Sequence, residues 1–148
     1  MTKILFICHG NICRSPMAER VFRAMAAKAG RAGEFRVDSA ATSREEIGNP
    51  IYPPAARLLN AHGIDSRGHA ARQVTSVDYA AYDHLVLMDE NNRRNLHRLL
   101  GGDPAGKVSL LMEWAGKNKD VADPWYTGDF EATYRDVTEG CAAILKQL

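Results

Sequence analysis

The sequence predicts an α/β fold of three layers, in which a parallel β-sheet is covered by helices on both faces. Short apolar runs alternate with amphipathic helical patterns along all 148 residues, and this alternation is typical of parallel sheets with right-handed crossovers. The first run, Lys3–Cys8, is apolar almost throughout, as expected of a strand buried on both faces. Because no repeat, low-complexity tract or linker interrupts the pattern, we expect residues 1–148 to form a single domain.

The first strand and the first helix enclose a short loop. The strand Lys3–Cys8 ends at a His-Gly pair. Ser15 is a suitable N-cap and Pro16 a suitable first helical residue, so we expect the helix to begin there. Apolar residues then recur at a spacing of three and four positions until Gly30, which is suited to end a helix.

The next segment contains one strand and two helices. We expect the second strand at Phe35–Ala40. After a loop rich in proline, glycine and charge, Pro54–His62 has a helical pattern that ends at Gly63. Thr75 and Asp78 have the spacing of a capping box, so we expect a short helix to begin there.

The remaining chain repeats the alternation. We expect the third strand at His84–Met88, followed by a helix that begins at Asp89 and ends before Gly101. Lys107–Met112 is the expected fourth strand. The last helix is expected to begin near Asp129, because apolar residues recur from there at helical spacing.

Charge and hydropathy limit the possible partners. A net charge of +1 without a polybasic block argues against nucleic acid or a membrane surface as partner. The N-terminal apolar run is too short for a signal peptide, and no run approaches the ~20 residues of a membrane span. We therefore expect a cytoplasmic protein that acts as a monomer.

Three cysteines, Cys8, Cys13 and Cys141, are too few and too irregularly spaced for a disulfide framework or a zinc site. Cys141 lies on the apolar stripe of the last helix, where we expect it to be buried. We expect neither a metal nor a cofactor.

The loop between the first strand and helix has the residues of a phosphate site. Backbone N–H groups that turn inward at a helix N-terminus form an anion site, and Gly10 allows positive φ or a close backbone approach. Arg14 supplies a planar guanidinium that can donate to two phosphoryl oxygens in a bidentate manner. Such a field favours a thiolate at Cys8, to which Ser15 could donate its hydroxyl. The loop residues expected to line the phosphate are His9, Gly10, Asn11, Ile12, Cys13 and Ser15.

The combination C-x-x-x-x-x-R-S between a buried strand and an amphipathic helix is far more specific than any of its residues alone. It is not a nucleotide-binding P-loop, because the Gly-Lys-Ser/Thr ending is absent.

The segment CHGNICRSPMAE resembles the signature of the low-molecular-weight protein-tyrosine phosphatases. The segments VDSAATS, EIGNP, ARQV, YDHLVLMDENN and DPWYTGDFEATY have counterparts in the same order, so the resemblance covers nearly the whole chain. It implies a flavodoxin-like fold with a four-stranded parallel sheet and a phosphocysteine intermediate formed without a metal. It also implies phosphotyrosine-containing proteins as substrates and inorganic phosphate as product.

The resemblance also assigns the acid. A tyrosine leaving group needs a proton, and DPWY resembles the acid loop of the family, which makes Asp123 the general acid. The proline that follows should restrict Asp123 to an extended conformation. By similarity, Trp125 and Tyr126 form the walls around the phosphotyrosine ring.

Other residues match supporting positions of the family. Asn11 tolerates left-handed φ, and the resemblance implies that Asn11 braces the loop with Ser39 and His69 as its partners. Arg72 and Asp89 also match, and we expect only structural roles for them.

The chain departs from the family at Glu45, where relatives often carry an aromatic wall. We expect Glu45 to weaken the binding of the phosphotyrosine ring on that side. We also expect it to lower the tolerance for acidic substrate residues that flank the phosphotyrosine. His9 lies on the same rim, either as an ordinary surface residue or as a specificity contact. Cys13 is expected to act as a resolving thiol that captures oxidised Cys8, as its counterpart does in the family.

Two other functions compete with this interpretation. Arsenate reductases on the same fold pass a disulfide along a relay, which needs two further cysteines near residues 87–100, where this chain has none. A non-catalytic module that binds phosphotyrosine or another oxyanion would need neither Cys8 nor Asp123.

Overall fold

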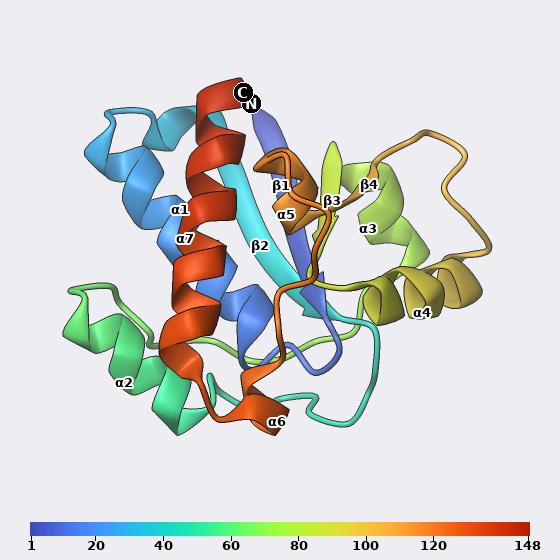
Figure 1. The fold of residues 1–148 in the computed structure, drawn as a ribbon. Helices are drawn as coiled ribbons and strands as arrows, with labels where there is room; N and C mark the ends of the chain where they lie inside the picture. Colours follow the sequence, from blue (N-terminus) through green and yellow to red (C-terminus); the bar gives the residue numbers. More distant parts are fainter.

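A computed structural model describes all residues 1–148. Its centre is a parallel sheet of four strands in the order β2-β1-β3-β4. The expected fold class is therefore confirmed, and helices cover both faces of the sheet (Figure 1). The strands are β1 (Thr2–Cys8), β2 (Phe35–Ala41), β3 (His84–Leu87) and β4 (Val108–Leu110).

The helices connect these strands and extend the chain beyond the last of them. They are α1 (Arg14–Lys28), the 3₁₀-helix η1 (Ala32–Glu34), α2 (Pro53–Ala61), α3 (Ser76–Ala81), α4 (Glu90–Leu100), α5 (Leu111–Trp114), α6 (Pro124–Thr127) and α7 (Phe130–Gln147). None of them combines the length and the apolarity that a membrane-spanning helix requires.

The two faces of β1 contribute to two separate cores. Ile4 and Phe6 pack into the larger core, which α1 and α7 cover, and Leu5 and Ile7 pack into the smaller one, with residues of α4. All four side chains are fully buried. This burial on both sides explains the continuous apolar run in the sequence.

Several helix ends follow the sequence prediction. Thr75 and Asp78 form the expected capping box of α3, and Asp89 is the N-cap of α4. The Asp129 side chain accepts from the Ala132 backbone N–H at the start of α7.

The predicted start of α1 is wrong. Cys13, not Ser15, is the N-cap residue, and no side chain caps the helix. The Ser15 hydroxyl instead lies 3.0 Å from the Cys8 sulfur. The first turn of α1 continues the loop after β1, and its backbone N–H groups at the helix start have no side-chain cap.

The fourth strand is shorter than predicted. β4 ends at Leu110, and the expected strand residues Leu111 and Met112 begin α5. The Glu113 carboxylate accepts from the Leu110 backbone N–H at 2.6 Å and holds this turn. A short apolar run does not distinguish a strand from a buried helical turn. Neither α5, α6 nor η1 was predicted.

The carboxyl end of the sheet positions the site. β1 ends at Cys8, and its loop meets the loop after β2 through the backbone bonds of Thr42 N–H to Cys8 and Ser43 N–H to His9. Helix α6 lies at the same end of the molecule (Figure 1). Ligands of open parallel sheets bind at this edge.

Candidate active site

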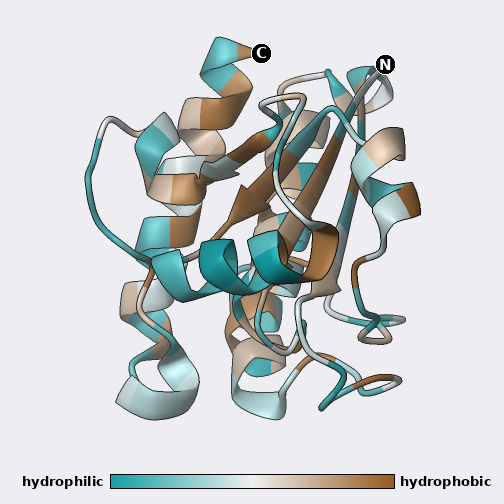
Figure 2. Ribbon diagram, turned by 90° about the vertical axis from the view of Figure 1, so that its right-hand side faces the viewer, coloured by the Kyte–Doolittle hydropathy of each residue, from teal (hydrophilic) through white to brown (hydrophobic).

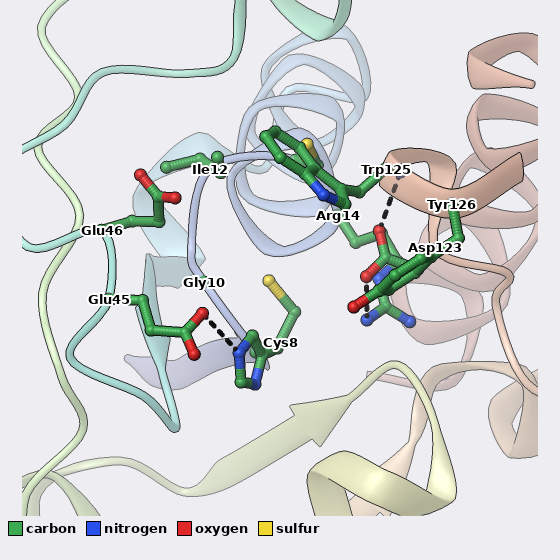
Figure 3. Close-up of a pocket in the computed structure, with 11 residues that line it drawn as sticks. Cys8, Gly10, Ile12, Arg14, Glu45, Glu46, Asp123, Trp125 and Tyr126 are labelled. Atoms are coloured by element: carbon green, nitrogen blue, oxygen red, sulfur yellow. Dashed lines mark hydrogen bonds and ion pairs between the residues drawn. The ribbon is translucent and has the colours of Figure 1, made fainter. Parts of the chain in front are cut away.

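A pocket of about 190 Å³ opens beside the end of β1 (Figure 3). Its lining comes from three segments that are distant in sequence: the first loop, the loop after β2, and the segment that leads into α6. The lining residues are Cys8, His9, Gly10, Ile12, Cys13, Arg14, Glu45, Glu46, Asp123, Trp125 and Tyr126. Glu46 is the one of them that the sequence did not indicate.

The Cys8 thiol lies at the base of this pocket. Its side chain is almost fully buried, and its sulfur points toward the pocket (Figure 3). The Asn11 backbone N–H donates to the sulfur at 3.3 Å, and the Ser15 hydroxyl lies 3.0 Å away. Two donors at one sulfur stabilise a negative charge on it.

Asn11 braces the loop from below. It is the only non-glycine residue with positive φ, at 59°, whereas Gly10 does not adopt this conformation. The Asn11 side-chain amide donates to Ser15 Oγ at 2.8 Å and to Ser39 Oγ at 2.9 Å. The Arg72 backbone N–H donates to Asn11 Oδ1 and thereby orients the amide.

This orientation determines the direction of the Ser15 hydrogen bond. Because Ser15 Oγ accepts from Asn11, its own proton can go to the Cys8 sulfur at 3.0 Å or to the Ala40 carbonyl oxygen at 3.5 Å, and the sulfur is the nearer acceptor. The Ser15 hydroxyl can therefore donate a hydrogen bond to a thiolate at Cys8.

His69 supports the same loop through the backbone. Its Nε2 lies 2.6 Å from the Asn11 carbonyl oxygen. Burial lowers the pKa of His69, and the hydrogen bond to Asn11 opposes this effect. Since a carbonyl only accepts, a neutral His69 must carry its proton on Nε2.

A buried carboxylate that the sequence did not indicate extends the network. Glu19 is almost fully buried in α1, and Ser39 donates its hydroxyl to Glu19 Oε1 at 2.6 Å. Arg23 pairs with the other carboxylate oxygen at 2.8 Å. The available signal was the position of Glu19 one turn after Ser15, on the face of α1 that the loop covers.

Arg14 is held by contacts on one side of its guanidinium. Nη1 donates to Asp89 Oδ2 at 2.7 Å and to the Val121 carbonyl oxygen at 2.8 Å. Nη2 makes a longer contact of 3.4 Å with Asp123 Oδ2. Burial alone would lower the pKa of Arg14, but the negative charges of Cys8, Asp89 and Asp123 raise it. Asp89, expected to be merely structural, thus orients the side chain that faces the pocket.

Asp123 lies between Arg14 and the start of α6. Its backbone is extended, with φ −80° and ψ 113°, as the following proline predicts. Oδ1 accepts from the Trp125 backbone N–H at 3.0 Å, so the carboxylate also caps α6. This cap holds the carboxylate at the edge of the pocket (Figure 3).

Two exposed aromatic side chains stand beside Asp123. Trp125 is 54% exposed and Tyr126 is 85% exposed. The Trp125 ring packs against Tyr52, with 4.9 Å between ring centroids. One aromatic is therefore supported from behind, and the other faces solvent.

Glu45 and His9 form a pair on the opposite rim. His9 Nε2 lies 2.9 Å from Glu45 Oε2, and both side chains are largely exposed. The neighbouring Glu46 carboxylate accepts from the Asn49 side chain at 2.6 Å. This rim, where the resemblance implied an aromatic wall, carries two carboxylates.

The other two thiols differ in their access to the pocket. Cys13 is buried beside Ile12 and Ala71 but still lines the pocket. Burial, followed by the negative charges of Cys8 and Asp123, raises the pKa of Cys13 to about 12. Cys141 is fully buried in the main core, and burial raises its pKa as well. A thiol in that position cannot take part in a surface disulfide relay.

Comparison with known proteins gives one consistent result. A family model described as low molecular weight phosphotyrosine protein phosphatase matches residues 3–148. The human protein of that name is 40% identical over 97% of this chain and 94% of its own length. The crystal structure of YfkJ from Bacillus subtilis is similar with a TM-score of 0.95 at 38% identity, over 99% of this chain and 94% of that chain. The low molecular weight phosphatase from Streptococcus pyogenes gives a TM-score of 0.89 at 36% identity, over 100% and 93%. This chain belongs to the low molecular weight protein-tyrosine phosphatase family.

Proposed function

We propose that this enzyme hydrolyses phosphotyrosine in proteins through a phosphocysteine intermediate. Cys8 is the nucleophile, Arg14 the phosphate clamp and Asp123 the general acid and base. One observation carries the proposal: the buried Cys8 thiol, with donors from Asn11 and Ser15, lines the same pocket as Arg14 and Asp123.

In the first step, the Cys8 thiolate attacks phosphorus and the bond to the tyrosine oxygen breaks. Asp123 gives its proton to the departing oxygen, and phosphocysteine forms. Arg14 Nη1 is occupied by Asp89 and Val121, so Nε and Nη2 are the donors for two phosphoryl oxygens. The long contact between Nη2 and Asp123 is the one that substrate would replace.

In the second step, a water molecule attacks the phosphocysteine. The Asp123 carboxylate takes a proton from this water, the bond between sulfur and phosphorus breaks, and inorganic phosphate leaves. Ser15 donates to the sulfur and stabilises the thiolate as leaving group. The reaction as proposed needs neither a metal nor a cofactor.

The aromatic side chains at the entrance support an aryl substrate. Trp125 and Tyr126 are exposed, which suits rings that stack on a phosphotyrosine ring. The pocket of about 190 Å³ lies between them and the pair of His9 and Glu45. The acidic rim suits a neutral or basic residue next to phosphotyrosine better than an acidic one at that side.

Turnover of p-nitrophenyl phosphate with a chelator present tests the proposal. Wild type should be active, whereas Cys8→Ser and Arg14→Ala should each lose activity while retaining the wild-type circular dichroism spectrum. If Cys8→Ser retains even about a tenth of the wild-type kcat, the covalent mechanism is wrong, because a serine alkoxide does not form readily at this position.

We further propose that the enzyme is a cytoplasmic monomer. The three unpaired cysteines support a reducing compartment. Two of the large exposed apolar side chains, Trp125 and Tyr126, line the pocket, so their exposure does not require a subunit interface. Light scattering at increasing protein concentration should give the mass of one chain.

The arrangement of thiols also supports redox control. Peroxide would oxidise the Cys8 thiolate to a sulfenic acid and be reduced to water. Cys13 would then attack this sulfur, so that a disulfide forms and water leaves. Cys13 lines the same pocket, which supports its role as the resolving thiol.

A further inference from the structure

A second, shallow pocket lies next to the active-site pocket. It has a volume of about 350 Å³ and is formed by the loop after β2 and by α4. Its lining residues are His9, Thr42, Ser43, Asn95, Arg98 and Leu99; we call it the Arg98 pocket. His9 belongs to both pockets and is paired with Glu45.

The Arg98 pocket has an unpaired positive charge. Arg98 is exposed and has no ion pair or hydrogen bond with another residue. Its neighbours on α4 differ, because Arg93 pairs with Glu90 and Glu113, and Arg94 contacts Asn91. No carboxylate lines the pocket. Helix α4 is also the strongly hydrophilic helix in the foreground of Figure 2.

The polar groups around this charge are suited to an oxyanion. Thr42 is 7% exposed, and its hydroxyl is buried without a hydrogen-bond partner. Ser43 Oγ accepts from the Glu45 backbone N–H at 3.4 Å and keeps its own proton available. The Asn95 side chain makes no hydrogen bond within the protein. Donors without partners at a cationic site favour a negatively charged acceptor.

We propose that the Arg98 pocket binds the carboxylate of an acidic residue that lies a few positions from the phosphotyrosine in the substrate polypeptide. The inference rests on the proposed function, because it needs a phosphotyrosine in the neighbouring pocket. Because His9 lines both pockets, a peptide that leaves the active site past the pair of His9 and Glu45 reaches the Arg98 pocket. One that leaves on the other side passes the Glu46 carboxylate, which has no ion pair but accepts a hydrogen bond from Asn49. The entrance therefore distinguishes the two directions of the substrate chain.

Paired peptides test this inference. Both peptides of a pair contain phosphotyrosine and have the same sequence except at one position, where one has Glu and the other has Gln. This position is one of the three residues before or the three residues after the phosphotyrosine. For wild type at low salt, Glu on one side should raise kcat/KM about two- to fivefold over Gln, the effect expected of an exposed ion pair. This ratio should fall toward one at high salt.

Variants of the enzyme test whether the preference for Glu over Gln depends on the Arg98 pocket. Arg98→Gln should abolish the preference for Glu, and Arg98→Glu should replace it by a preference for Lys at the same position. Thr42→Val, which removes the unpartnered hydroxyl and keeps the side-chain shape, should weaken the preference. The matched control is Arg94→Gln, which removes the same charge from the same helix outside the pocket and should leave the ratio unchanged.

Two results would overturn the inference: an unchanged ratio in Arg98→Gln, or an equal fall in Arg94→Gln, which would indicate general steering by α4. Hydrolysis of p-nitrophenyl phosphate and of the Gln peptides should be the same in all four variants and wild type. A wild type that fails on those substrates would instead count against the proposed function.

Discussion

Asp123 has two contacts that separate its structural role from its proposed chemical role. Oδ1 caps α6 through the Trp125 N–H, and Oδ2 faces Arg14. Asparagine caps helices about as well as aspartate but carries no transferable proton. Asp123→Asn therefore removes the acid and preserves the cap.

We expect Asp123→Asn to lower kcat by roughly 10²–10⁴-fold on phosphotyrosine. The loss should be smaller on aryl phosphates with very acidic leaving groups, which depart without a proton. The measurement is kcat for a series of aryl phosphates with wild type and variant. An equal loss across the series would remove Asp123 from the acid role.

Cys13 is the second residue whose role is open to a direct test. Because its pKa is raised to about 12, Cys13 is a thiol at neutral pH and should react with iodoacetamide far more slowly than Cys8. Oxidation of Cys8 to the uncharged sulfenic acid removes one of the negative charges that raise this pKa. Burial, the largest cause of the raised pKa, remains, so the pKa falls only in part.

After a peroxide pulse and dithiothreitol, wild type should recover most of its own untreated activity. Cys13→Ser should recover little, and mass spectrometry should show sulfinic or sulfonic acid at Cys8. Cys141→Ala is the control, because it removes a core thiol and leaves the pair in the loop. Equal recovery of Cys13→Ser and wild type would leave Cys13 as a packing residue.

At the scale of secondary-structure elements, the contact between α5 and α7 depends on a glycine. A Cβ atom at Gly140 would overlap the Leu111 side chain. Gly140 is buried within α7, and Leu111 is the first residue of α5. The glycine thus allows the close approach of two helices, although it disfavours the helix that contains it.

Gly140→Ala should lower the free energy of unfolding by about 1–3 kcal/mol, because overpacking exceeds the gain in helix propensity. Urea denaturation measures this change. Leu111→Ala alone should also destabilise the protein by about 2–5 kcal/mol, through a cavity. The double variant should be more stable than the sum of the two losses predicts. Strict additivity would show that the two side chains do not compete for one space.

At the scale of the whole molecule, Tyr82 links the helix layer to the sheet. Tyr82 is mostly buried, and its hydroxyl donates to Asp38 Oδ2 on β2. Burial, followed by the hydrogen bond and charge of Asp38, raises the pKa of Tyr82 to about 12 from its usual 10.0. Between these values the folded state binds more protons than the unfolded state, so stability must fall as the pH rises.

We expect the full contribution of Tyr82 to stability below pH 10 and a loss of up to about 2 kcal/mol by pH 12. Denaturation at pH 9 and pH 11.5 measures it, and residues 1–148 should unfold in one cooperative transition, as a single domain does. Tyr82→Phe should flatten this dependence, whereas Tyr126→Phe, whose ring is 85% exposed, should retain it. The same slope in wild type and Tyr82→Phe would contradict the assignment.

Features that depend on neighbours along the chain could be predicted from the order of residues alone. The alternation of buried strands and amphipathic helices, the caps at Thr75 and Asp89 and the left-handed residue Asn11 follow from local periodicity and local hydrogen bonds. The motif around Cys8 and Arg14 could be recognised for the same reason, because the loop between β1 and α1 is made of consecutive residues. Where a local pattern suited two structures, as in the run after β4, the prediction was wrong.

Which distant groups meet depends on how the whole chain folds. The partners of Arg14 are Asp89, Val121 and Asp123, at separations of 75, 107 and 109 residues. No periodicity encodes such contacts, because they depend on the order of the strands and on which loops share the carboxyl edge of the sheet. The pairing of His9 with Glu45, and the Arg98 pocket behind it, arise in the same way. The chemistry of the loop at Cys8 depends on the order of its residues. The shape and charge of the pocket entrance depend on how loops from different elements pack side by side.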